Sequence, residues 1–245
     1  MGRIAFTVFG VDIAWYGLLI AIGMMLGVLL AVKRAKNIGV TEEVVYDIAL
    51  WSIPAGVLGA RIYYVIFNLD YYSSDWSRIL QFRQGGLAIH GGIIVGFIVG
   101  YLICQKNKVN FLSMADVAAP SMILGQAIGR WGNYFNQEAY GRPTELPWAI
   151  MIDGVNVHPT FLYESIWNII VMIGLILYTK KKKVEGEIFF LYLIFYSIGR
   201  FFIEGLRTDS LMIGPFRTAQ LISLFMIIGG YVSIQYLKKI KANQV

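Results

Sequence analysis

Polar side chains gather between residues 126 and 142, in a stretch that is also rich in aromatic residues and glycine. This stretch holds two arginines, two asparagines and a glutamate, which are Arg130, Arg142, Asn133, Asn136 and Glu138. A water-exposed loop does not need so many aromatic residues, and a buried helix tolerates so many polar groups only when they have partners. We therefore predict that this stretch forms a functional site.

A second group of polar residues lies in the segment 186–205. Tyr196, Arg200 and Glu204 follow one another at intervals of four, which places them on one face of a helix. Further candidates near the ends of apolar segments are Arg61, His90, His158, Glu164 and Arg207. An arginine inside a membrane costs about 2.5–3.5 kcal/mol on insertion scales. Because the arginines at these ends outnumber the glutamates, we expect an additional anionic partner.

The composition indicates which elements position these residues. Of the 245 residues, 57% are hydrophobic and 15% are charged, whereas a soluble domain usually has about 25% charged residues. The mean hydropathy is +0.62. Segments of about 20 apolar residues can cross a bilayer, and they occur at 13–32, 44–67, 86–104, 111–130, 160–179, 186–205 and 216–237. We therefore predict an all-α integral membrane protein with seven transmembrane helices in a single polytopic domain, residues 1–245.

The lysines predict the orientation of these helices. They follow the first, third, fifth and seventh segments, at positions 33, 36, 106, 108, 180–183, 238, 239 and 241. Positively charged loops stay in the cytoplasm, so the N-terminus is expected outside and the C-terminus in the cytoplasm. Residues 132–159, a long polar stretch with several glycines and prolines, then form a small extracytoplasmic cap between helices 4 and 5. The candidate residues lie toward the outer leaflet.

Cofactor chemistry finds little support in the sequence. We find no glycine-rich nucleotide-binding loop, and the two histidines lack the companions that a zinc site needs. We therefore predict no metal and no cofactor. The formal charge of +6 is interpreted through membrane topology and not as a sign of nucleic-acid binding.

Five short motifs follow one another along the chain. They are WYG at 15–17, GGLAIHGG at 85–92, GRWGNYFNQEAYG at 129–141, HPTFLYE at 158–164 and YSIGRFFIE at 196–204, with Arg207 beyond. Together they resemble the motifs of the bacterial phosphatidylglycerol–prolipoprotein diacylglyceryl transferase family, and the resemblance covers nearly the whole chain. Tyr134 departs from it, because the family usually has phenylalanine there.

The resemblance implies a seven-helix enzyme that moves the diacylglyceryl group of phosphatidylglycerol to the lipobox cysteine of a prolipoprotein. A thioether forms and glycerol phosphate leaves, in the first step of lipoprotein maturation. The implied partners are phosphatidylglycerol, prolipoprotein lipobox peptides and the lipid bilayer. The implied location is the bacterial cytoplasmic (inner) membrane, with the active site toward the outer leaflet.

By their match to the family motifs, Arg130 and Arg200 are assigned to the departing phosphate, because arginine binds phosphate through paired hydrogen bonds. The expected substrate-binding residues are Tyr16, Arg61, Asn133, Asn136, Glu138, Gly141, Tyr196, Glu204 and Arg207. His158 and Glu164 are expected to support the site structurally. Catalysis would then be mainly electrostatic, with hydrogen-bond donors held in place in a site of low dielectric constant.

The group that removes the thiol proton stays open at this stage. His90 suits the role of general base because an imidazole exchanges protons near neutral pH. Glu138, Glu164 or Glu204 can also serve if burial raises the carboxyl pKa, and nearby arginines can instead lower the pKa of the thiol.

Simpler interpretations compete with these assignments. Arg200 and Glu204 can form an ordinary ion pair within one helix, and Asn133 and Asn136 can simply cap turns. A transporter is a second class of function, but its charges would lie near the middle of the membrane, often with internal repeats. A lipid-headgroup phosphatase or phosphotransferase is a third, but it would need a nucleophile or a carboxylate cluster for metal binding.

Overall fold

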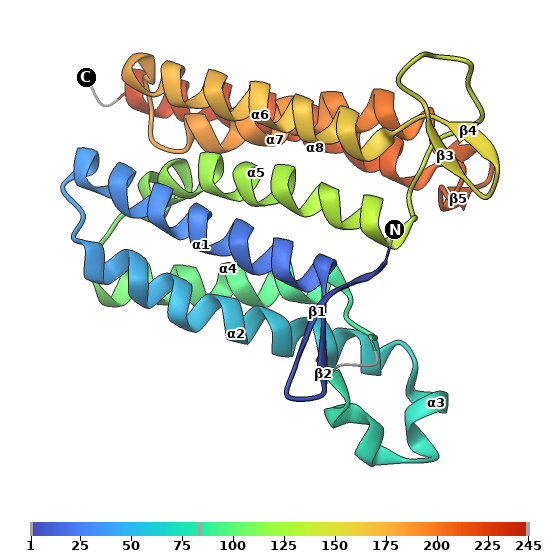
Figure 1. The fold of residues 1–245 in the computed structure, drawn as a ribbon. Helices are drawn as coiled ribbons and strands as arrows, with labels where there is room; N and C mark the ends of the chain where they lie inside the picture. The colour runs from blue at the N-terminus through green and yellow to red at the C-terminus, as the bar shows by residue number, and fades with distance from the viewer. Residues whose placement is uncertain (1, 83–84, 244–245) are drawn as a thin grey trace. The chain divides into compact units, whose positions relative to one another are not determined.

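The computed structural model describes residues 2–82 and 85–243, and this part of the chain is mostly helical (Figure 1). Within it, seven helices are at least 18 residues long: α1 (Trp15–Ala35), α2 (Glu42–Ile66), α4 (Ile89–Lys106), α5 (Phe111–Asn136), α6 (Thr160–Tyr178), α7 (Glu187–Glu204) and α8 (Thr218–Ala242). Shorter turns of helix are α3 (Leu69–Ser73), η1 (Lys36–Ile38), η2 (Trp76–Leu80) and η4 (Thr179–Lys181). Each long helix overlaps one of the predicted apolar segments.

Six of these helices are long and apolar enough to cross a membrane: α1, α2, α4, α5, α6 and α8, among the described residues. The chain is therefore an integral membrane protein. The remaining predicted span, 186–205, corresponds to α7, an 18-residue helix that carries three charged side chains, Glu187, Arg200 and Glu204. All 18 residues of α7 are needed to cross a membrane, and they include these three charges, so its crossing stays a prediction.

Two expectations need correction. The all-α prediction did not include three antiparallel hairpins: β1 (Ile4–Val8) with β2 (Val11–Ala14), β3 (Ile150–Ile152) with β4 (Val155–Val157), and β5 (Met212–Ile213) with β6 (Phe216–Arg217). The predicted cap at 132–159 also begins too early, because α5 continues to Asn136. Aromatic packing accounts for this extension: Trp131 packs on Phe161 with ring centroids 5.3 Å apart, and Phe135 stacks on Trp15 at 4.7 Å.

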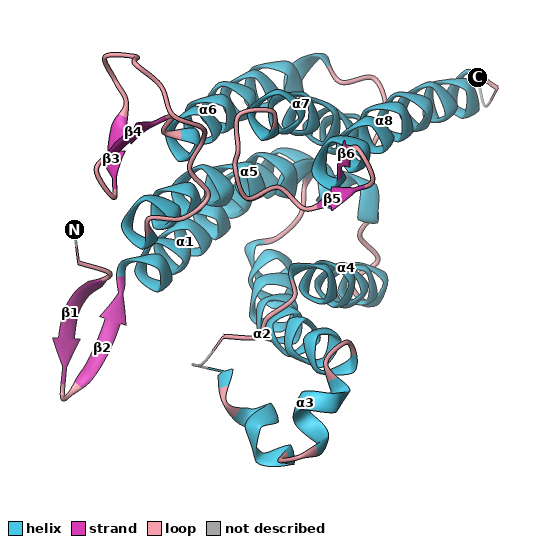
Figure 2. Cartoon of the chain, turned by 90° about the vertical axis from the view of Figure 1, so that its right-hand side faces the viewer, coloured by secondary structure: helices cyan, strands magenta, loops and turns pink. Residues whose placement is uncertain are grey.

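The described residues divide into two compact units, which we treat separately. One unit contains residues up to 31 and from 115 onward, and it includes α1, α5, α6, α7 and α8. The helices α6, α7 and α8 lie side by side in both views (Figure 2). A core joins α5, α6 and α7, and its buried members are Ala119, Ile123, Val171, Leu175, Ile188 and Tyr192. This core fixes the relative positions of the three helices that carry most of the candidate residues.

Helix α1 packs against α5 through small residues. A Cβ atom added to Gly23 would lie 3.2 Å from the carbonyl oxygen of Gly125, and one added to Gly27 would lie 3.1 Å from that of Ser121. Backbones this close need small side chains at the crossing. The same close approach brings the start of α1 to the end of α5.

The second unit, residues 32–114, consists mainly of α2 and α4. These helices also cross closely at glycines, since a Cβ atom added to Gly91 would lie 2.3 Å from the carbonyl oxygen of Gly59. The segment between them folds around the buried side chain of Arg61, which is described below. This unit contains His90, in the first turn of α4.

Candidate active site

A buried glutamate of α6 is the centre of the candidate site. Glu164 lies one turn into the helix and is 4% exposed. The helix begins at Thr160, directly after Pro159, and the Thr160 hydroxyl donates a hydrogen bond to the carbonyl oxygen of Ala139. This bond ties the start of α6 to the segment that follows α5. Burying a carboxylate is costly unless it is paired, so Glu164 requires cationic neighbours.

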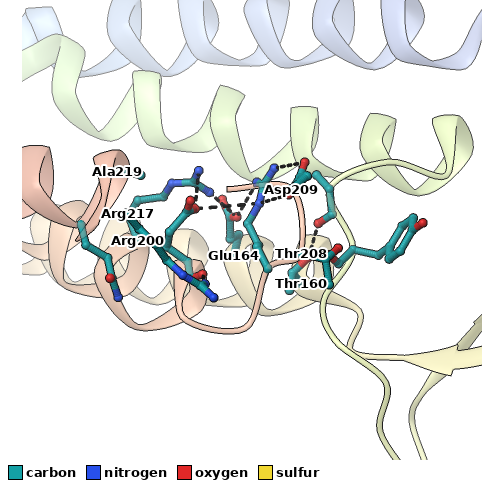
Figure 3. Close-up of polar contacts among 12 residues, drawn as sticks. Thr160, Glu164, Arg200, Thr208, Asp209, Arg217 and Ala219 are labelled. Atoms are coloured by element: carbon teal, nitrogen blue, oxygen red, sulfur yellow. Dashed lines mark hydrogen bonds and ion pairs between the residues drawn. The ribbon is translucent and has the colours of Figure 1, made fainter. Parts of the chain in front are cut away.

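Two arginines from different helices supply that pairing. Arg200 of α7 donates from Nη1 to Oε1 of Glu164 at 2.8 Å (Figure 3). Nη2 of Arg130 from α5 lies 2.6 Å from Oε2 of Glu164. Nη2 of Arg130 also donates to the Tyr196 hydroxyl at 3.4 Å. The site therefore brings Arg130, a candidate from the motif at 129–141, together with Tyr196 and Arg200, candidates from the motif at 196–204.

Arg200 joins Glu164 to a second buried carboxylate. Its Nη2 atom lies 2.7 Å from Oε2 of Glu204, one turn along α7. This contact is a close ion pair but not a hydrogen bond, because Glu204 Oε2 accepts no hydrogen bond from the described residues. Arg217, which precedes α8, donates to the backbone carbonyl oxygen of Glu204. Both terminal nitrogens of Arg200 are thus engaged by protein carboxylates.

Arg207 adds a third arginine just beyond the end of α7. It donates from Nε and Nη2 to the two carboxylate oxygens of Asp209, at 2.9 and 2.8 Å. Its Nη1 lies 3.7 Å from Glu164 Oε1, and its Nε lies 3.8 Å from Glu204 Oε2. The hydrogen bonds from Arg207 hold the pKa of Asp209 below its ordinary value of 3.8. The cluster therefore contains a two-pronged arginine fork that already binds an anion.

The segment after α5 supports this corner through backbone contacts. The Arg142 amide donates to the Leu206 carbonyl oxygen at 2.8 Å, and the Gly141 amide donates to that of His158 at 2.9 Å. A Cβ atom on Gly141 would lie 2.7 Å from the His158 Cβ and 3.1 Å from the Leu206 oxygen. Only glycine fits at position 141, because His158 and Leu206 approach it too closely to leave room for a side chain.

The polar residues at the end of α5 form their own cluster. The side chains of Asn133 and Asn136 donate to Oε1 of Glu138 at 3.0 and 3.2 Å, and the Glu138 amide donates to the Asn133 carbonyl oxygen at 3.0 Å. Tyr16 packs into the notch at Gly132, where an added Cβ would lie 2.3 Å from the tyrosine ring. These contacts close the helix end, which favours the turn-capping interpretation of the asparagines.

The comparison with known proteins identifies the family. The family model described as prolipoprotein diacylglyceryl transferase matches residues 3–236. The chain belongs to the prolipoprotein diacylglyceryl transferase family. A relative from Clostridioides difficile is 56% identical over 245 residues, which are 100% of this chain and 99% of the relative. A relative from Finegoldia magna is 52% identical over 242 residues, 98% of each chain, and both relatives are named phosphatidylglycerol–prolipoprotein diacylglyceryl transferase. Family membership confirms the resemblance carried by the motifs.

Two residues predicted for this family site lie in the unit of residues 32–114. Arg61 is buried, and its three guanidinium nitrogens donate to backbone carbonyl oxygens of Arg78, Ile79, Gln81, Gly85 and Gly86. A guanidinium has five N–H groups, so these five bonds occupy it fully. This favours a structural role for Arg61 over the predicted substrate binding. His90 is exposed on α4, and its ring centroid lies 6.2 Å from that of Tyr63. Its catalytic role stays a prediction.

His158 contacts other residues of the cap. Its Nδ1 lies 3.2 Å from the Tyr163 hydroxyl, which also accepts a hydrogen bond from the Trp148 indole at 2.9 Å. Within residues 2–82 and 85–243, no group of three or more histidines, cysteines or acidic residues is arranged to hold a metal ion.

Sequence reasoning missed two members of the cluster. Asp209 supplies a third carboxylate, so that Arg130, Arg200 and Arg207 face as many acidic groups as there are arginines. Its signal in the sequence is its position two residues after Arg207, just beyond a helix end. Arg217 had no signal beyond being an arginine at the start of an apolar segment. With Asp209, carboxylates and ion-paired arginines are equal in number, while Arg217, which donates to a backbone carbonyl oxygen, leaves one arginine in excess.

Proposed function

We propose that this protein transfers the diacylglyceryl group of phosphatidylglycerol to the thiol of the lipobox cysteine of prolipoproteins. The family match over residues 3–236 supports this activity, and so do the names of the full-length relatives. The observation that carries the proposal is the convergence of Arg130, Arg200 and Arg207 on two buried glutamates at one end of their helices. Such a cluster suits a reaction in which a phosphate group must be held while its charge grows.

The reaction is a substitution at carbon that leaves all oxidation states unchanged. The lipobox sulfur, as thiolate, attacks the glycerol carbon that bears the phosphate. A C–S bond forms, the C–O bond to phosphate breaks, and its electron pair leaves with the phosphate oxygen. The thiol proton passes to a base. The products are a thioether-linked diacylglyceryl group and glycerol phosphate.

Arg130 and Arg200 are the proposed phosphate ligands. Glu164 holds both guanidinium groups through its two oxygens, at 2.6 and 2.8 Å, so their positions are set before the lipid binds. Donors that are fixed in advance stabilise developing charge without reorganisation. Glu164 is therefore a positioning residue in this proposal, and Tyr196 further orients Arg130.

His90 is the proposed general base. Glu164 and Glu204 are already occupied by arginines, and Glu138 accepts bonds from two asparagines, so these carboxylates are less available for a proton. An imidazole has an ordinary pKa near 6.5 and exchanges protons readily at neutral pH. Replacing His90 with glutamine should reduce turnover strongly at neutral pH and less at high pH, where the thiol ionises by itself. Near-normal turnover at both pH values would contradict the assignment.

The proposed topology has seven spans, an outer N-terminus and a cytoplasmic C-terminus. In the unit that holds the arginine cluster, lysines lie at the opposite helix ends: Lys182 pairs with Asp116 near the start of α5, and Lys238 pairs with Glu187 at the start of α7. The positive-inside rule places this lysine end in the cytoplasm. The cluster and the cap then face the outer leaflet of the bacterial cytoplasmic membrane. All three charges of α7 are locally paired, which lowers the cost of its crossing.

A single assay tests the activity. The purified protein in detergent receives phosphatidylglycerol and a lipobox peptide, and mass spectrometry detects the diacylglyceryl adduct while a coupled assay detects glycerol phosphate. We expect both products from the wild type and neither from Arg130→Ala. Arg78→Ala removes an arginine from the other unit and should retain activity. Lipid consumption without peptide modification would show a hydrolase, and the absence of both products would refute the transferase.

A further inference from the structure

We propose that Asp209 is a resident anion of the arginine cluster that weakens the binding of the phosphomonoester product more than the binding of the phosphodiester substrate. This inference rests on the transferase activity proposed above. It assigns Asp209 a role in product release and substrate discrimination that the motifs do not suggest.

The first observation is the geometry of the Arg207–Asp209 pair. Nε and Nη2 of Arg207 donate to separate oxygens of Asp209 at 2.9 and 2.8 Å. This is the two-pronged arrangement in which arginine also binds phosphate oxygens. Asp209 therefore occupies the fork that a phosphate group would otherwise use, and a phosphate that binds Arg207 in this way must displace the carboxylate.

The second observation is the difference in exposure among the three carboxylates. The side chain of Asp209 is 49% exposed, whereas those of Glu164 and Glu204 are 5% and 3% exposed. A displaced Asp209 carboxylate can rotate into the surrounding solvent, whereas the carboxylate of a buried glutamate cannot reach solvent in this way. Asp209 is therefore the carboxylate of the cluster that a ligand can displace from the arginines.

Backbone contacts keep Asp209 near the fork after displacement. Gly141 and Arg207 form an antiparallel bridge, and the Thr208 hydroxyl donates to the Tyr140 carbonyl oxygen at 3.4 Å. Residues on both sides of Arg207 are thus attached to the segment that follows α5. The Asp209 carboxylate can rotate but stays within a side chain's length of Arg207, so it continues to act on a bound phosphate.

The charges of substrate and product explain the discrimination. The phosphodiester of phosphatidylglycerol carries one negative charge, whereas a phosphomonoester has a second pKa near 6 and carries about −1.5 to −2 at pH 7. Coulomb repulsion from a fixed carboxylate grows in proportion to the ligand's charge. Asp209 therefore repels the product about twice as strongly as the substrate, and so it lowers the affinity for the product by the larger factor.

The charged groups around Asp209 are consistent with a carboxylate that stays ionised. Arg207 bonds it directly, Arg200 of α7 acts on it through space, and the hydrogen bonds from Arg207 lower its pKa. Glu164 lies 3.7 Å from Nη1 of Arg207, and Glu204 lies 3.8 Å from its Nε, which also donates to Asp209. Between pH 5 and 8 the change of charge then occurs on the product and not on Asp209.

The test compares wild type with Asp209→Asn, which keeps the shape and removes the charge. We measure the KM for phosphatidylglycerol and the inhibition constant of glycerol phosphate at pH 7.5 and pH 5. At pH 7.5 the variant should be inhibited roughly tenfold more strongly, with a KM lowered by about threefold or less, since repulsion scales with ligand charge. At pH 5 the two changes should become equal, because the product then carries one charge.

Two control variants make the result specific. Asp209→Glu keeps the charge and should retain the wild-type ratio of inhibition constant to KM. Asp153→Asn removes an exposed carboxylate from the turn between β3 and β4 and should change neither value. Equal changes in KM and inhibition constant for Asp209→Asn at both pH values would overturn the proposal, because a merely structural role would affect both ligands alike.

Direct binding separates this inference from the proposed activity. Calorimetry with glycerol phosphate and with inorganic phosphate measures affinity without turnover, on wild type and Asp209→Asn in detergent. Tighter binding by the variant at pH 7.5, with the difference reduced at pH 5, supports the role of Asp209 even if no thioether forms. Unchanged binding overturns the role even if transferase activity is present.

Discussion

At the scale of single residues, the site depends on carboxylates shared between arginines. Glu164 accepts from Arg200 at 2.8 Å and lies 2.6 Å from Arg130, while Arg200 also reaches Glu204 at 2.7 Å. Each glutamate neutralises a buried charge and at the same time fixes the direction of a guanidinium group. Removing one carboxylate therefore leaves unpaired charge at several positions, and stability and activity should change together.

Glu164→Gln tests this coupling. Removing one partner of a buried ion pair costs about 3–5 kcal/mol, and we expect a loss of that order in the free energy of unfolding together with near-complete loss of transfer. Denaturation in detergent and the peptide assay measure the two quantities. Glu145→Gln, at an exposed position of the cap, is the matched control and should change neither. Wild-type stability with lost activity would mean that Glu164 acts in chemistry alone.

The Arg207–Asp209 pair predicts a specific pH dependence of stability. The pKa of Asp209 is lowered in the folded protein from an ordinary value of 3.8, chiefly by hydrogen bonds from Arg207. A lowered pKa stabilises the folded state above the unfolded pKa, and this contribution disappears as the pH falls through the folded pKa. The difference in unfolding midpoint between wild type and Asp209→Asn should thus be constant from pH 7 to about pH 5 and shrink below about pH 4. A difference that grows on acidification would contradict the pairing.

At the scale of elements, buried polar side chains hold irregular segments in place. Arg61 of α2 donates hydrogen bonds to carbonyl oxygens of η2 and to those of Gly85 and Gly86, just before α4. The Ala88 amide then donates to the Ala60 carbonyl oxygen at 3.0 Å. One arginine thus organises the segment that leads into the helix of His90, through bonds to backbone carbonyl oxygens.

Arg61→Lys should loosen this segment. Lysine keeps the charge but supplies three donors from a single point and cannot satisfy carbonyl oxygens spread around a planar fork. We expect faster amide hydrogen exchange in η2 and at Gly85 and Gly86, with little change in the middle of α2. Arg78→Lys changes the neighbouring half-buried arginine, keeps a cation beside Asp75, and should leave exchange unaltered. Unchanged exchange with weaker lipid binding would restore the substrate-binding role.

At the scale of the whole molecule, charge separates the two ends of the helices. In the unit with the arginine cluster, lysines pair with Asp116 and Glu187 at one end, while Arg130, Arg200 and Arg207 meet Glu164 and Glu204 at the other. The lysine end favours the cytoplasm. In the topology that we propose, the opposite end faces the outer leaflet, where we propose that the substrates are anchored.

Cysteine labelling tests this orientation and the crossing of α7. After Cys104→Ala, which removes the chain's only cysteine, a cysteine is placed at Leu211 or at Lys181, on either side of α7. In intact cells a membrane-impermeant maleimide should label Leu211→Cys and leave Lys181→Cys unlabelled until the cells are opened. Labelling of both positions from outside would refute seven spans.

The sequence by itself determined the membrane class, the family and most of the candidate residues. Long apolar segments can satisfy their backbone only as helices in a bilayer, and the spacing of Tyr196, Arg200 and Glu204 places them on one helical face. Local sequence also carried the motifs, because they are contiguous. It could not show that α5 continues to Asn136, since packing of Trp131 and Phe135 on residues of other segments decides where that helix ends.

Only the tertiary structure decided which charges meet. Arg130, Glu164 and Arg200 come from three helices, and the core between α5, α6 and α7 sets the distances among them. It also separated Arg61, which binds carbonyl oxygens, from the arginines that bind carboxylates. An arginine has the same formal charge in both settings. Its partners depend on contacts between residues far apart in the chain, and composition and spacing do not encode these contacts locally.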